Sequence, residues 1–215
     1  YFGCLLAFCI YSVFLFISTK EKIHIIYAVF LMLLIINTCV YYGVSTEFIH
    51  PKQPDFNNPL LPFSFALCMF FFFVFAKIYL KMSAQPPNIL LEIYHIITII
   101  LLLISPLAFL LGHAAGHAAN AVLVLFNIGI LLILTIRLCL DKNTHAIFLL
   151  VAFLPLGTSL SLKLLSLDNL FSSQHLFERN FYLPESTIFS VVALSFSIAH
   201  AMKTMRREME LARSR

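Results

Sequence analysis

Hydrophobic residues form long stretches along this chain, and short polar segments separate them. The stretches at 60–75 and 89–104 continue on every face of a helix and lack the period-two alternation of a half-buried strand. The predicted spans that contain these stretches are each about 18 to 23 residues long, which crosses a hydrocarbon core of about 30 Å at about 1.5 Å of rise per residue. The pattern predicts an all-α membrane protein, because a transmembrane barrel would show alternating strands of about ten residues.

Seven such stretches predict a bundle of seven transmembrane helices. They lie at 1–18, 23–42, 60–80, 89–111, 119–140, 145–165 and 185–205, which together make one transmembrane domain over 1–205, and 206–215 is expected to begin a cytoplasmic linker helix. The composition agrees, because 61% of the residues are hydrophobic and 11% are charged, against about 45–50% and about 25% in soluble domains. A water-soluble fold could not cover that much apolar surface.

Basic residues are distributed unevenly between the two sides that the predicted spans define. Eleven fall on one side: Lys20, Lys22, Lys77, Lys81, Arg137, Lys142, Lys203, Arg206, Arg207, Arg213 and Arg215. The other side has Lys52, Lys163 and Arg179. Because lysine and arginine concentrate in cytoplasmic loops, we predict that the N-terminus lies outside the cell and the C-terminus in the cytoplasm.

The last predicted helix continues beyond the membrane. Its apolar residues Ile198, Met202, Met205 and Met209 are separated by four, three and four positions, which is the spacing of a coiled coil. No glycine or proline interrupts 186–215, so one continuous helix could carry a shift or rotation inward. The pattern is compatible with a homodimer, and equally with a helix that the neighbouring basic residues only anchor at the headgroups.

Polar residues inside the predicted spans are candidates for contacts between helices. Asn37, Asn127 and Ser159 are of this kind, and Asn120 shares a helical face with Asn127 because seven residues separate them. Such side chains usually form interhelical hydrogen bonds, and less often they contact a ligand. No acidic residue lies at mid-membrane depth, which disfavours proton-driven transport but leaves a carrier for a small neutral solute open.

The sixth predicted span contains a candidate hinge. Pro155 and Gly157 follow each other closely, and proline removes a backbone donor while glycine loosens the next turn. We expect a kink there.

Four histidines on the predicted outer side could together form a metal site. His113 and His117 are four residues apart, so they would share one face of a helix, and His50 and His175 are expected on the same side. Such a site is typical of a zinc-dependent membrane hydrolase that resembles the haemolysin III and adiponectin-receptor families. The neighbouring glycines argue against a continuous helix at His113, and that family has its N-terminus inside. The same histidines could instead sense pH.

Residues near both ends of the chain carry a resemblance to a known family. The motifs are YFGCLL at 1–6, YSVFLF at 11–16, TKEK at 19–22 and LSFSIA at 194–199. They resemble the membrane domain of bacterial seven-transmembrane receptors with diverse intracellular signalling modules. The resemblance implies a sensory domain outside the cell before Tyr1, and a kinase, cyclase or phosphatase module in the cytoplasm after Arg215.

We therefore expect a signal-transducing domain in the bacterial inner membrane. A ligand event outside would change the packing of the bundle, and the seventh helix would carry the change inward. We expect no catalytic residue, cofactor or metal in this segment, and no nucleic acid partner. Since the chain begins with Tyr1 and not with methionine, we expect it to be part of a longer protein.

Overall fold

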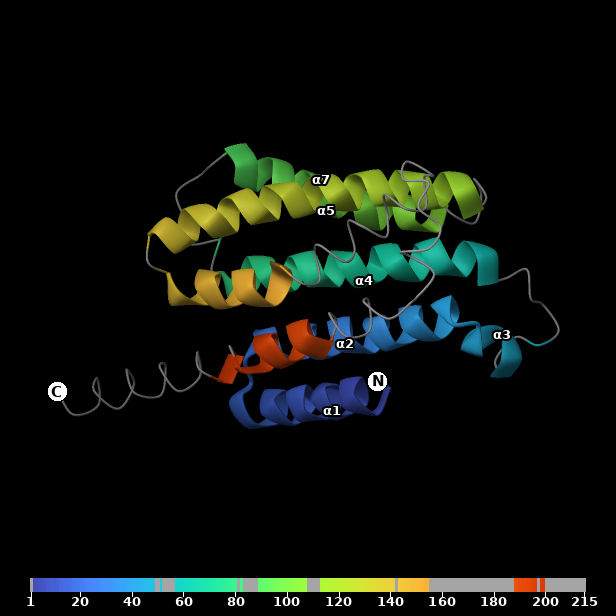
Figure 1. Ribbon diagram of the computed structural model, residues 1–215, viewed down its shortest axis with the longest axis horizontal. Helices are drawn as coiled ribbons and strands as arrows, with labels where there is room; N and C mark the ends of the chain where they lie inside the picture. Colours follow the sequence, from blue (N-terminus) through green and yellow to red (C-terminus); the bar gives the residue numbers. More distant parts are fainter. Residues whose placement is uncertain are drawn as a thin grey trace, which may run out of the picture. The chain divides into compact units, whose positions relative to one another are not determined.

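A computed structural model describes residues 2–48, 51, 57–80, 82, 89–107, 113–141, 143–154, 188–196 and 198–199. Every regular element in these residues is a helix, which confirms the all-α class. The chain divides into two compact units, residues 1–134 and 135–215. The elements are α1 (Phe2–Thr19), α2 (Lys22–Tyr41), α3 (Val44–Phe48), α4 (Asn57–Tyr79), α5 (Ile89–Ile104), the 3-10 helix η3 (Ser105–Leu107) and α7 (His113–Leu140) (Figure 1).

Four helices of the described part are long and apolar enough to cross a membrane. They lie at Phe2–Thr19, Lys22–Tyr41, Asn58–Tyr79 and Ala118–Leu140, within α1, α2, α4 and α7. Ile89–Ile104 and Thr144–Leu154 are apolar helices of shorter length. The protein is therefore a multi-pass α-helical membrane protein.

Helix α2 packs between α1 and α4 in the first unit (Figure 1). The contact between α2 and α4 is aromatic, and we call its four rings, Tyr27, Phe30, Phe72 and Phe75, the aromatic core. The ring centroids of Tyr27 and Phe75 are 5.1 Å apart, and those of Phe30 and Phe72 are 5.5 Å apart. All four side chains are buried. Since lipid tails are as apolar as these rings, it is close packing and not hydrophobicity alone that holds the two helices together.

Helix α1 exposes most of its apolar side chains. Leu5 and Ser12 are its buried residues, whereas Ile10, Phe14 and Ile17 are more than half exposed. An apolar helix face that is exposed in this way is what a membrane protein presents to lipid.

Lys20 ends α1 in a left-handed backbone conformation, with φ of 59°. Its N–H donates to the carbonyl of Phe16 at 2.8 Å, which closes the last turn of the helix. The chain then enters α2 at Lys22, so two residues connect α1 and α2. The turn therefore depends on a conformation that glycine adopts more easily than any other residue.

Replacing Lys20 with glycine should stabilise the protein by up to about 1 kcal/mol, whereas valine should destabilise it by at least as much, because a β-branched residue suits a positive φ least. Both variants remove the same charge. At Lys22, in the first turn of α2, the order should reverse, and glycine should be worse than valine by about 0.3 kcal/mol. Unfolding in mixed micelles would measure the stability of the glycine and valine variants at both positions. If glycine were the more stable of the two at Lys22 as well as at Lys20, the result would contradict the structure.

Two helix ends differ from the spans that hydrophobicity predicts. Helix α5 ends at Ile104 and continues as η3 through Leu107, although the apolar stretch reaches 111. Pro106 explains this, because proline removes a donor and disfavours helical geometry in the residue before it. Helix α7 begins at His113, before the expected span at 119. The glycine at 116 does not prevent the helix there, and the surrounding alanines have the highest helix propensity.

The predicted outer loop between the second and third spans contains the short helix α3. It begins directly after Gly43, whose φ of 75° ends α2. The second unit contains helices at 144–154 and 188–196, with Ile198 also helical. The first of these begins after Asn143, whose side-chain oxygen accepts the N–H of His145 at 3.0 Å and caps the helix.

Candidate functional site

A chain of buried hydrogen bonds joins three helices of the first unit. Asn127 on α7 donates through Nδ2 to Thr98 Oγ1 on α5 at 2.9 Å, and the Thr98 hydroxyl donates to the carbonyl of Tyr94 at 2.7 Å. Tyr94 Oη donates to the carbonyl of Phe73 on α4, also at 2.7 Å. The chain therefore runs from α7 through α5 to α4.

The donor and the acceptor in each of these hydrogen bonds follow from the hydrogens that each group carries. The Thr98 hydroxyl has one hydrogen, and the carbonyl of Tyr94 can only accept it. The Thr98 oxygen must then accept from Asn127, so the amide of Asn127 points its nitrogen toward α5 and its oxygen elsewhere. Asn127, Thr98 and Tyr94 are all buried, which makes each bond costly to break.

The rings of Tyr94 and Phe73 add a packing contact to the same place. Their centroids are 5.9 Å apart and their planes are inclined by 78°, an edge-to-face arrangement. The two side chains therefore hold α5 against α4 by a hydrogen bond and an aromatic contact together.

Two further amides connect other helices to α4. Asn120 on α7 donates through Nδ2 to the carbonyl of Pro62 at 3.0 Å, and Asn37 on α2 donates through Nδ2 to Ser64 Oγ at 3.0 Å. The Ser64 hydroxyl donates in turn to the carbonyl of Leu61 at 3.1 Å. Helix α4 therefore accepts hydrogen bonds from α2, α5 and α7.

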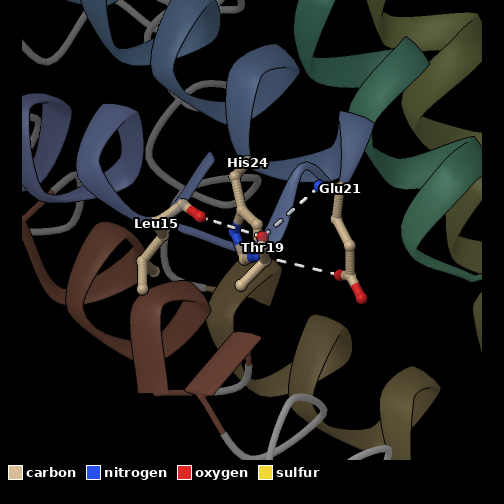
Figure 2. A network of polar contacts seen from close by, with 4 residues as sticks. All are labelled: Leu15, Thr19, Glu21 and His24. Atoms are coloured by element: carbon tan, nitrogen blue, oxygen red, sulfur yellow. Dashed lines mark hydrogen bonds and ion pairs between the residues drawn. The ribbon is translucent and has the colours of Figure 1, made fainter. Parts of the chain in front are cut away.

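A second polar group lies at the turn between α1 and α2 (Figure 2). Thr19 Oγ1 donates to the carbonyl of Leu15 at 2.9 Å and accepts the N–H of Glu21 at 3.3 Å. His24 Nε2 lies 3.7 Å from Glu21 Oε2, and the imidazole is fully buried. This separation is too long for a hydrogen bond, and among the described residues neither ring nitrogen has a hydrogen-bond partner. His24 was not among the residues that the sequence indicated.

The structure describes four of the residues that the sequence indicated, and Asn120 is one of them, with its hydrogen bond to the Pro62 carbonyl. Asn37 and Asn127 each donate to a neighbouring helix, and Ile198 is buried in the second unit. Thr98, Tyr94 and Ser64 were missed, although a hydroxyl-bearing residue inside an apolar stretch was itself a signal, because such side chains usually face a neighbouring helix. The remaining candidates lie outside the described residues: His50, Pro155, Gly157, Ser159, His175, Met202, Met205 and Met209.

Of the candidate metal site, the structure describes only the backbone at His113 and His117. Helix α7 includes both His113 and His117, so the two positions lie one turn apart on one helix, and their side chains are outside the described part. Among the side chains that the structure describes, no three histidine, cysteine, aspartate or glutamate residues gather to hold a metal.

Apolar helices of membrane-spanning length, joined by buried amide and hydroxyl contacts, define a polytopic helical membrane domain. A family model for the 7TM diverse intracellular signalling domain matches residues 1–201. The chain belongs to this family, which confirms the resemblance seen in its end motifs. The family is a domain of signalling receptors and is not known as catalytic. Comparison with curated proteins and with solved structures finds no match.

Proposed function

We propose that this chain is the signal-transducing domain of a bacterial sensory receptor in the inner membrane. The observation that carries the proposal is the family match over residues 1–201. A stimulus outside the cell changes the packing of the helices, and the last helix carries the change to a kinase, cyclase or phosphatase module after Arg215. The N-terminus is then outside, as the distribution of basic residues indicates.

The buried hydrogen bonds support this mechanism. A bundle that switches between two packings needs contacts that are either made or broken, and directional hydrogen bonds between helices have this property. The bonds of Asn37, Asn120 and Asn127 join α4 and α5 to their neighbours in this manner. Pro155 and Gly157 are the proposed hinge, and Ile198, Met202, Met205 and Met209 the proposed relay face.

Changing the phase of the last helix should change the output without any ligand. Insertion of two alanines after Arg215, before the native output module or a fused cyclase, rotates that module by about 200° about the helix axis, whereas seven residues restore the phase to within about 20°. We expect the output activity to change several-fold with two inserted residues and to return close to its original level with seven.

Membrane abundance of each insertion variant, measured by immunoblot, is the control for expression. Reporter tags after Ser83 and after Arg215 should both be cytoplasmic, and a tag within 51–59 should be outside. An output that is the same for all insertion lengths would contradict transmission through a continuous helix, and a cytoplasmic tag within 51–59 would contradict the orientation.

A further inference from the structure

Two amide oxygens on α7 are fully buried. They are Oδ1 of Asn120 and Oδ1 of Asn127, and no described residue donates a hydrogen bond to either. Both side chains have 0% exposure. Buried acceptors of this kind are rarely left unpaired, so each one calls for a donor that the described residues around it do not supply.

Turning each side-chain amide over, so that its oxygen and nitrogen exchange places, does not give the buried oxygen a donor. The nitrogen of Asn120 is held by the Pro62 carbonyl, which can only accept, and the nitrogen of Asn127 is held by a hydroxyl oxygen whose hydrogen is already used. Exchanging oxygen and nitrogen would lose both bonds. The two oxygens must therefore be the unpaired atoms.

The two sites belong to one face of one helix. Seven residues separate Asn120 from Asn127, which is about 10 Å along the helix axis, and Val124 between them is buried as well. Leu131 continues the same buried face. Two acceptors in an aliphatic stripe therefore face the interior of the bundle, two turns apart.

The occupant that these groups require is a small neutral donor. A cation would lose its hydration among neutral side chains, because Asn120, Asn127 and Thr98 carry no charge to replace it. A water molecule meets the requirement, because it can donate a hydrogen bond to the amide oxygen. At Asn127 the Thr98 hydroxyl oxygen, which holds the amide nitrogen, has a second lone pair that can accept from the same water.

We propose that Asn120 and Asn127 are buried hydration sites, each holding an ordered water on Oδ1 inside the helix bundle. The proposal is independent of the signalling role. The bound water gives each amide a partner that remains when the neighbouring helix moves. The helices can then exchange hydrogen bonds without leaving the amide unpaired.

X-ray radiolytic footprinting of the full-length receptor in H2¹⁸O can test the proposal, because hydroxyl radicals formed from internal water label nearby side chains that bulk solvent does not reach. We expect ¹⁸O label in the peptide that contains 120–131. The label should fall at least threefold in the double variant Asn120→Leu/Asn127→Leu. The variant Asn37→Leu is the matched control, because it removes an intramembrane amide that is bonded to Ser64, and it should keep the label at 120–131.

A high-resolution structure of the unmodified receptor gives a second measurement that does not depend on variants. Density for water should lie about 2.7–3.2 Å from both oxygens. An unlabelled peptide at 120–131 in the wild type, a label that the double variant leaves unchanged, or a protein donor at either oxygen would overturn the proposal.

Discussion

Replacing Phe72 with alanine should destabilise the protein by about 3–5 kcal/mol, the largest loss that we expect from a single substitution. The ring is 1% exposed, and its centroid lies 5.5 Å from that of Phe30 on α2 and 5.7 Å from that of Phe73. Its removal leaves a cavity in the aromatic core that rigid helices cannot close. Unfolding in mixed micelles, monitored by circular dichroism, measures the loss.

The matched control is Phe126 on α7, which is 62% exposed on an apolar surface. Truncation of a ring that faces lipid leaves no cavity, so Phe126→Ala should change the free energy of unfolding by no more than about 0.5 kcal/mol. Equal losses for the two phenylalanines would mean that α2 and α4 do not pack through the aromatic core.

Replacing Thr98 with valine should cost about 1–3 kcal/mol, because the buried amide of Asn127 then loses the only acceptor that the described structure gives its nitrogen. The double variant Thr98→Val/Asn127→Leu should be more stable than Thr98→Val alone, since it leaves no unpaired donor. Comparison of both single variants, the double variant and the wild type in the same unfolding assay gives the coupling free energy.

Thr38 is the control for this pair. Its hydroxyl donates to the carbonyl of Leu34 in its own helix, so Thr38→Val should change stability by less than about 0.5 kcal/mol. Additive effects of Thr98→Val and Asn127→Leu would show that the hydrogen bond between α5 and α7 does not form.

The sequence could predict the helices and the polar positions within them better than the hydrogen-bond partners of those polar residues. Long apolar stretches are sufficient to predict membrane-spanning helices, and the spacing of Asn120 and Asn127 places them on one face. That spacing does not tell which helix lies opposite. Asn127 donates to α5 and Asn120 to α4, and this depends on how the helices pack.

The helix ends were harder to predict, because hydrophobicity reports what the bilayer accepts and not where a helix stops. The end of α5 is set by Pro106, within an apolar stretch, and the start of α7 lies among alanines outside the predicted span. His24 was overlooked for a related reason. A histidine near a charged turn is usually solvated, and only the packing of the helices shows that its ring is buried.

The hydrogen bonds that α4 accepts from three other helices limit how this bundle can rearrange. The carbonyls of Pro62 and Phe73 and the hydroxyl of Ser64 are acceptors on one rod, and each serves a different neighbour. A twist of that rod about its own axis would strain all three attachments together. Intermediate orientations of α4 would satisfy none of these three hydrogen bonds. Movement of α4 should therefore be concerted, with few stable intermediates between one set of hydrogen bonds and the next.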